Sequence, residues 1–228
     1  MEIKLEKRPK SPILIEGFPG FGLIGTIVTE FLIKHLNAEP IGKIQMSEIP
    51  PVIAVHAGKA VEPLGIFYDK KNNLVILHAL ASVQGFEWGL VNILADLVKE
   101  LKVKEVISLE GVGSNSEEKD VRAFYLGTNK KLKSLGIEPL KEGIIVGVTG
   151  ALLLRKDLPV TCLFAETHST LPDSRAAAKI VEVLDSYLGL DVDFKPLLQK
   201  AMEFEAKLRG IMEKTKSVSS DKKLTYFG

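Results

Sequence analysis

Continuous apolar runs recur along the chain and are separated by segments whose apolar residues repeat with a helical spacing. The runs lack the polar alternation of half-exposed strands, so they are typical of strands that are buried on both faces. Two runs, 64–69 and 73–80, are joined by Lys70-Lys71-Asn72-Asn73 and predict a hairpin. The other predicted strands cover 12–17, 41–46, 51–57, 105–113, 122–128, 142–150 and 159–167.

The segments between these runs predict helices. Residues 22–36 and 87–101 carry apolar side chains at three- and four-residue spacing, which places them on one face of a helix. Residues 173–189 predict a helix that begins at Asp173, a favourable N-cap, and ends at Gly189. Shorter helices are predicted for 129–136 and 148–157.

Strands that alternate with helices predict an α/β fold with a largely parallel sheet, and the hairpin makes that sheet mixed. A chain of 228 residues is long enough to bury a full core. We expect one α/β domain over residues 1–213. Residues 214–228 are polar and rich in Ser and Lys until the last few positions, and they predict a flexible tail.

The last helical segment, 194–212, follows a sheet that is already complete. Its apolar stripe must therefore cover the domain or another subunit. We expect this amphipathic helix to contribute to an oligomer interface through Phe204, Leu208, Ile211 and Met212.

Composition narrows the class of protein. Basic and acidic residues number 30 and 29, so the net charge of +1 gives no electrostatic footprint for nucleic acid or an anionic membrane. The single cysteine, Cys162, fits a reducing, cytoplasmic setting. A cysteine within a buried strand is more often a core thiol than a nucleophile, so we expect Cys162 to be a core thiol. His56 and His78 lie in apolar strands and lack a second ligand at a metal-binding spacing, so we expect no metal site. No apolar run approaches the roughly 20 residues of a membrane span.

Gly20, Gly22 and Gly25 have the spacing G-x-G-x-x-G between a strand and a helix, as in dinucleotide-binding turns. That interpretation requires an acidic residue about 20 positions later for the ribose. Glu48 lies near that distance but precedes Ile49-Pro50-Pro51, which favours an extended turn.

Phe18 and Phe21 would also crowd a phosphate or pack inward. The alternative is structural: the glycines permit a tight turn and let the helix lie close to the sheet. We favour that role for Gly17, Gly20, Gly22 and Gly25, and we expect no cofactor.

Polar side chains follow several predicted strands. Glu110, Thr149, Glu166 and His168 come at carboxyl ends, where open α/β sheets form ligand crevices. A phosphorylase-like or hydrolase-like enzyme would use Glu110, Glu166 and His168 together. In the alternative interpretation, Glu110 satisfies turn amides, and the other two hydrogen-bond the loop before Asp173.

Three blocks of sequence resemble the proteasome assembly chaperone family, in particular archaeal-type relatives of its second eukaryotic member. The blocks are GFPGFGLIG at 17–25, GVTGALLL at 147–154 and AETHSTLPDSRAAAKIVEVL at 165–184. The resemblance implies a three-layer α/β/α fold similar to that of nucleoside phosphorylases. It also implies self-association and a role in assembling the α-ring of the 20S proteasome, alone or with a paralogue.

The C-terminus bears on the same resemblance. Members of the family and proteasome activators often end in a hydrophobic-tyrosine-any tripeptide that inserts between α subunits. This chain ends Tyr226-Phe227-Gly228, so its penultimate aromatic residue is Phe227 and the tyrosine lies one position early. A flexible tether with terminal aromatics can still bury apolar area in a cleft. We expect Leu224, Tyr226, Phe227 and Gly228 to dock on a partner, and we expect no catalysis.

Overall fold

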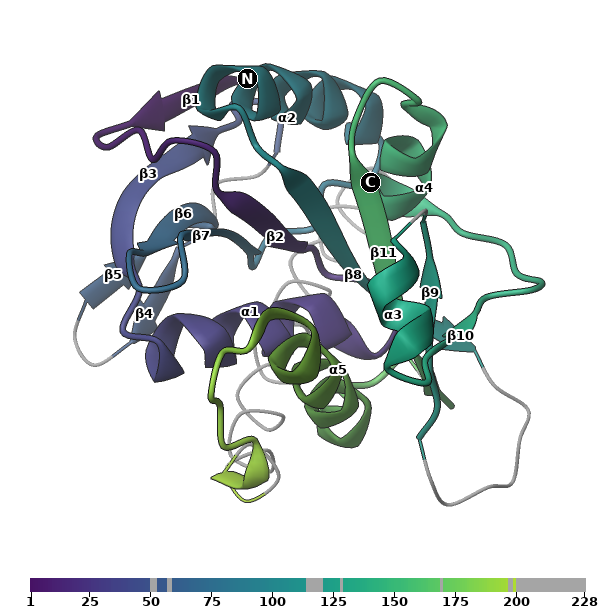
Figure 1. Ribbon diagram of the computed structural model, residues 1–228. Coiled ribbons are helices and arrows are strands. Elements are labelled where there is room, and N and C mark those ends of the chain that lie inside the picture. Colours follow the sequence, from purple (N-terminus) through teal and green to yellow (C-terminus); the bar gives the residue numbers. More distant parts are fainter. Residues whose placement is uncertain are drawn as a thin grey trace, which may run out of the picture.

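Residues 1–49, 53–56, 59–113, 121–127, 129–168, 170–196 and 199 are described by the structure, a computed structural model. Within them, a mixed sheet of nine strands forms the middle layer (Figure 1). The strand order is β1-β3-β6-β7-β2-β8-β11-β9-β10. The strands are β1 (Glu2–Leu5), β2 (Ile13–Gly17), β3 (Glu39–Gln45), β6 (Leu64–Asp69), β7 (Leu74–Ala79), β8 (Glu105–Gly113), β9 (Ala123–Leu126), β10 (Glu138–Pro139) and β11 (Val160–Thr167).

The central strands β7, β2, β8 and β11 run parallel, as their continuous apolar runs predict. The flanking strands β1, β3 and β6 pair antiparallel, and β6 and β7 form the predicted hairpin. On the other side, β9 pairs antiparallel with β11. A separate two-stranded ribbon joins β4 (Ala54–His56) and β5 (Lys59–Val61).

Helices cover both faces of the sheet, which gives the predicted three-layer α/β fold. Figure 1 shows α1 and α5 below the sheet and α2 and α4 above it. Each pair buries its own apolar cluster against the strands. The helical elements are the 3-10 turn η1 (Phe21–Leu23), α1 (Ile24–His35), α2 (Glu87–Leu101), α3 (Lys130–Ser134), α4 (Gly147–Leu154) and α5 (Ser174–Leu188).

Several predicted boundaries are confirmed. The helix α2 and the strand β8 span the predicted residues, and α5 begins directly after Asp173. The Asp173 side chain caps α5 by accepting hydrogen bonds from the amides of Arg175 and Ala176 at 3.1 and 3.0 Å. No helix within the described residues is both long and apolar enough to cross a membrane.

The predicted strand at 142–150 is wrong. Residues 142–146 are irregular, Ile144 and Val146 are 92% and 72% exposed, and α4 begins at Gly147. The strand β11 already pairs with β8 on one side and β9 on the other, so no sheet edge next to it is available. Thr149 consequently projects from a helix rather than from a strand end.

The predicted helix 194–212 lies largely outside the described residues, and Phe204, Leu208, Ile211 and Met212 lie outside them entirely. The same holds for the predicted tail, 214–228.

The helix α1 crosses β2 and β8 in direct backbone contact. A Cβ atom on Gly25 would lie 2.7 Å from the carbonyl oxygen of Leu109 and 2.8 Å from the Cα atom of Gly17. A Cβ atom on Gly17 would lie 2.1 Å from the carbonyl oxygen of Gly25. The two glycines therefore set how closely α1 approaches the sheet.

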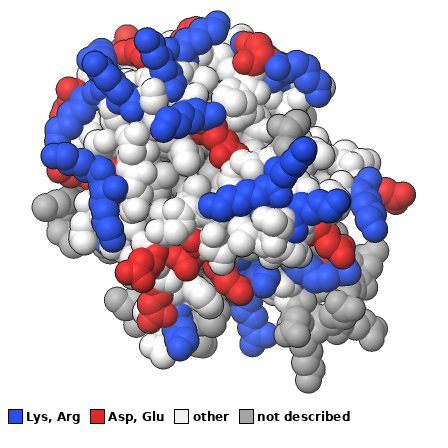
Figure 2. Space-filling model, in the orientation of Figure 1, with Lys and Arg blue, Asp and Glu red and all other residues white. Residues whose placement is uncertain are grey.

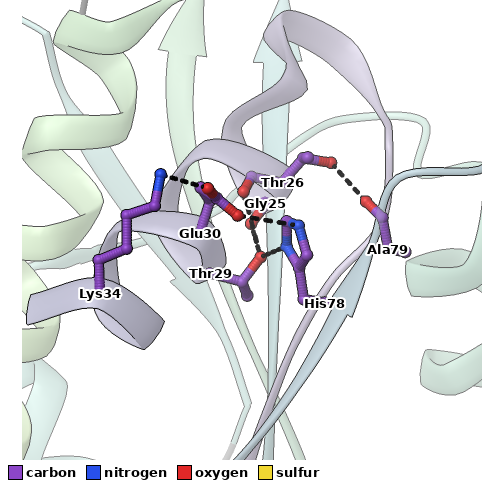
Figure 3. A network of polar contacts seen from close by, with 7 residues as sticks. All are labelled: Gly25, Thr26, Thr29, Glu30, Lys34, His78 and Ala79. Atoms are coloured by element: carbon purple, nitrogen blue, oxygen red, sulfur yellow. Dashed lines mark hydrogen bonds and ion pairs between the residues drawn. The ribbon is translucent and has the colours of Figure 1, made fainter. Parts of the chain in front are cut away.

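A buried polar network also holds α1 against β7 (Figure 3). The Thr29 hydroxyl lies 2.9 Å from His78 Nδ1, and Thr26 Oγ1 donates to the carbonyl oxygen of Ala79 at 3.1 Å. His78 Nε2 lies 3.3 Å from Glu30 Oε2. Burial lowers the pKa of His78 to about 4, because it outweighs the opposing effect of Glu30. His78 is thus a core histidine, as its position in an apolar run predicts.

We predict that Gly25→Ala lowers the free energy of unfolding by about 2 kcal/mol, because the new methyl group would collide with backbone atoms. The matched control is Gly89→Ala in α2, where a Cβ atom meets only the flexible Met1 side chain at 3.4 Å. Gly89→Ala should raise the free energy of unfolding by about 0.5 kcal/mol, since alanine favours a helix. Urea denaturation of both variants measures the two effects, and equal effects would contradict the close contact of α1.

Candidate functional site

The glycine-rich segment forms a turn at the carboxyl end of β2. Gly22 has φ +68° and Leu23 has φ +51°, so two consecutive residues are left-handed before α1 begins. Gly22 is the residue type that adopts this conformation without strain. Its carbonyl oxygen accepts a hydrogen bond from the amide of Asp173 at 2.9 Å, which ties the turn to the start of α5.

The Glu110 carboxylate binds the amides around this turn. Its Oε1 atom accepts hydrogen bonds from the amide of Phe21 at 3.1 Å and from the amide of Gly111 at 3.0 Å. A Cβ atom on Gly20 would lie 2.1 Å from the same oxygen, so a side chain at this position would displace the carboxylate. The backbone of the turn also lies close to β8. A Cβ atom on Gly111 would lie 2.1 Å from the carbonyl oxygen of Phe21.

This geometry bears on the dinucleotide interpretation. A pyrophosphate needs unpaired amides at such a turn, whereas the amide of Phe21 is already bound to a carboxylate of the same chain. Glu48 makes an ion pair of 3.1 Å with the amino group of Met1. Phe18 packs into the core and is 6% exposed. The residues present therefore do not fit a dinucleotide.

Behind Glu110 lies a row of polar side chains that crosses three parallel strands. Strand pairing places Glu16 of β2 and Cys162 of β11 beside Ser108 of β8, and all three are almost fully buried. The Ser108 hydroxyl lies 2.9 Å from Thr149 Oγ1, and Thr149 Oγ1 lies 3.4 Å from Glu110 Oε2. The hydroxyl groups of Ser108 and Thr149 thus lie between Glu16 on β2 and the carboxyl group of Glu110.

Burial dominates the electrostatics of this row. Desolvation raises the pKa of Glu16 to about 8. A hydrogen bond with Ser108 lowers this pKa in part, and the charge of Glu110 raises it further. The Oε1 atom of Glu16 is buried without a hydrogen-bond partner in the described structure. Desolvation also raises the pKa of Glu110 to about 7, although the two amides and Thr149 oppose it. Burial raises the pKa of Cys162, so this residue is a buried thiol.

A cavity of about 510 Å³ opens above Glu110 at the carboxyl ends of β2 and β8. The turn, the start of α2 and the irregular segment before α4 form its walls. Its described lining is Phe18–Phe21, Ser82–Gln84, Glu87, Glu110–Gly113 and Ile144–Val148.

The three side chains of the predicted enzyme site are not brought together in this cavity. Glu110 lines it, but Glu166 and His168 are absent from its described lining. Glu166 instead forms a bidentate ion pair with Arg122, whose Nε and Nη2 atoms donate to the carboxylate oxygens at 3.0 and 2.7 Å. Of the three residues that an enzyme of this kind would use together, the described lining of the cavity contains Glu110. The alternative role of Glu110, which is to satisfy turn amides, matches the hydrogen bonds to Phe21 and Gly111.

Sequence reasoning missed Glu16, Ser108 and Glu87 as members of this region. A signal existed for Glu16, because a carboxylate inside the otherwise apolar run 12–17 is out of place in a buried strand. Ser108 has the same kind of signal within 105–113, although it is weaker. Glu87 has none, since an acidic residue in the first turn of a helix is ordinary.

The opposite ends of the strands differ in charge. A second cavity, of about 730 Å³, lies at the amino ends of β8 and β11, and its lining includes Lys104, Arg155 and Lys156 together with Glu105. Arg155 is held by Asp157 through two contacts of 2.8 Å. Figure 2 shows Lys and Arg side chains spread over one face of the molecule with Asp and Glu between them. That face has mixed charge, unlike the acidic cavity at the carboxyl ends.

These features define a three-layer α/β protein with a cavity at the carboxyl ends of its parallel strands. The chain belongs to the PAC2 family, which it matches over residues 14–212.

Solved structures agree with this assignment. PbaA of Pyrococcus furiosus, described as an archaeal homologue of proteasome-assembly chaperone, is 34% identical and superposes with a TM-score of 0.83 over 95% of this chain and 99% of that one. PbaB of the same organism, described as an archaeal proteasome activator, has a TM-score of 0.74 over 92% of this chain and 98% of that one, at 24% identity. The uncharacterized protein MJ0106 of Methanocaldococcus jannaschii is 28% identical over 95% of this chain and 92% of its own length. The family and the likeness to PbaA support a role like that of proteasome-assembly chaperones.

We predict that stability falls by roughly 3 kcal/mol between pH 5 and pH 8 because of Glu16. Its folded-state pKa of about 8 exceeds the ordinary value of 4.5, so the folded state binds the proton more tightly. The contribution of Glu16 to the free energy of unfolding is fully present below the ordinary pKa of 4.5, and it is lost as the pH rises through the folded-state pKa of about 8.

Glu16→Gln should remove the part of the decline that Glu16 causes, because a neutral amide resembles the protonated acid, and should leave the part that the raised pKa of Glu110 causes. Urea denaturation at several pH values measures it, and Glu138→Gln on the exposed strand β10 is the control. An unchanged decline in Glu16→Gln would contradict a protonated, buried Glu16.

Proposed function

We propose that this protein is a non-catalytic, cytoplasmic assembly chaperone that self-associates and binds proteasome α subunits, alone or with a paralogue. The observation that carries the proposal is the likeness to PbaA, because it extends over nearly the whole of both chains at 34% identity. A role in assembly uses surfaces rather than a reaction centre.

Exposed apolar side chains supply a candidate binding surface. Ile144 and Val146 line the cavity and are 92% and 72% exposed. Large apolar side chains that gather around one opening are typical of a protein-binding surface. The proposal assigns a second contact to the C-terminal residues 224–228, whose aromatic side chains can fill a cleft on a partner.

We predict that deletion of residues 224–228 weakens binding to immobilised α subunits by at least about tenfold, because an oligomer that presents several tails gains avidity from each. The paired substitution Tyr226→Ala with Phe227→Ala should weaken binding similarly. Ser219→Ala with Ser220→Ala, in the same segment, is the control and should leave binding unchanged. Surface plasmon resonance measures all four proteins. Full binding by the shortened chain would reject tail docking, and no binding by the intact chain would reject the α-subunit partner.

We predict that self-association depends on the apolar stripe of residues 194–212. Leu208→Ser with Ile211→Ser should reduce the oligomer to a single chain, since each change removes buried apolar area from the proposed interface. Size-exclusion chromatography with light scattering gives the mass. Glu203→Ser with Lys207→Ser alters polar positions on the opposite side of the same predicted helix and should keep the oligomer intact. If both double variants keep the native mass, the interface lies elsewhere.

A further inference from the structure

The cavity above Glu110 has the dimensions of a small-molecule site. Its volume of about 510 Å³ falls within the range of ligand pockets, which runs from roughly 300 to 1,000 Å³. It lies at the carboxyl ends of β2 and β8, where open α/β sheets place their ligands. Its lining combines apolar residues and glycines with the polar side chains of Ser82, Gln84, Glu87 and Glu110.

The charge of the lining favours a cation. Among the described residues, Glu87 and Glu110 are the charged members of the lining, and Lys, Arg and His do not occur in it. An anion would lack a counter-charge there. It would also compete with Glu110 for the amides of Phe21 and Gly111.

Glu110 is arranged so that one carboxylate oxygen can serve a ligand. Its Oε1 atom is held by two backbone amides, which fix the orientation of the group. Its Oε2 atom has a single partner within the described structure, the hydroxyl of Thr149 at the long distance of 3.4 Å. Behind it, the buried Glu16 adds a second carboxyl group with an unpartnered oxygen atom. Of the two, Glu110 lines the cavity and attracts positive charge when it is ionised, whereas the raised pKa of Glu16 keeps that group largely protonated near neutral pH.

The walls suit an apolar body attached to that charge. Phe21 and Val83 line one part of the cavity, and Ile145 and Val148 line another. An aromatic ring and alkyl side chains bind the hydrocarbon part of a ligand, and the face of a ring also attracts a cation.

We propose that this cavity binds a small organic cation, an ammonium or guanidinium group on an apolar body, with Glu110 as its counter-ion and Glu87 at the opening. The proposal concerns a ligand of the folded domain and is independent of residues 224–228. Its failure would leave the proposed chaperone function untouched.

Binding should depend on pH, because the cation favours the ionised form of Glu110. The titratable groups that face Glu110 are Glu16 on β2, Cys162 on β11 and Glu87 at the start of α2. Burial raises the pKa of Glu110 to about 7, so the carboxyl group is largely protonated at pH 6 and largely ionised at pH 8. The affinity should therefore rise about tenfold from pH 6 to pH 8, and binding should release a proton.

The test is isothermal titration calorimetry of the intact protein with 2-phenylethylammonium and with its neutral analogue 2-phenylethanol. The ammonium compound should bind at least about tenfold more tightly than the alcohol at pH 8, because only the cation gains the charge-assisted hydrogen bond. The amide signals of Gly20 and Gly111 in nuclear magnetic resonance spectra should shift on binding, since both residues border the site.

Variants separate this site from a general attraction of amines to carboxylates. Glu110→Gln keeps an acceptor for the two amides, so the turn should remain folded, while ammonium binding falls at least tenfold and loses its pH dependence. Glu138→Gln, far along the sheet on β10, should bind as the native protein does. Glu16→Gln should keep the pH dependence that Glu110 confers.

Three outcomes would overturn the proposal. These are equal affinity for the alcohol and the ammonium compound, retained ammonium binding by Glu110→Gln, or no binding at 10 mM of either probe. Titration with inorganic phosphate is a further check, and phosphate binding that shifts the Gly20 signal would also overturn it.

Discussion

The structure depends on the close backbone contact between the glycine-rich turn and β8. Gly25 lies against the carbonyl oxygen of Leu109, and Gly111 lies against that of Phe21. The Glu110 carboxylate completes the contact through two amide hydrogen bonds and occupies the space that a side chain at position 20 would need. Backbone contacts of this kind tolerate no added methyl group. They set the position of α1, and through the amide of Asp173 they also connect the turn to α5.

This arrangement carries an electrostatic cost that the sequence pattern does not disclose. A carboxylate that caps a buried turn loses much of its hydration, and a second carboxyl group, Glu16, lies nearby in the sheet. Unpaired charges in such a place are unfavourable, so the groups respond by holding protons near neutral pH. The hydroxyls of Ser108 and Thr149 moderate the cost by hydrogen bonding. A stable fold and a charge-sensitive cavity are therefore two consequences of the same turn.

Much of the fold could be predicted from periodicity, and little of the site could. The apolar spacing at 87–101 fits a single type of element, a helix with one apolar face. The structure confirms α2 there. The apolar run at 142–150 has several outcomes, and which one forms depends on whether a sheet edge is available. Because β11 pairs with β8 on one side and with β9 on the other, no edge is available to this run. That pairing depends on the topology of the whole sheet, which the local apolar pattern does not contain. Glu110 and Glu166 lie on the neighbouring strands β8 and β11, yet a partner such as Arg122 decides where a side chain points.

The G-x-G-x-x-G spacing illustrates why a motif of backbone geometry does not determine chemistry. The spacing specifies a tight turn and a close helix, which are needed whether the turn amides meet a phosphate or a carboxylate. In this chain, the residue that decides between them is Glu110, which lies far along the sequence and reaches the turn only through the pairing of β2 with β8. A carboxylate in that place occupies amides that a phosphate would need and adds an acidic group to the lining of the cavity. The chemistry of the crevice is therefore set by one side chain rather than by the glycines.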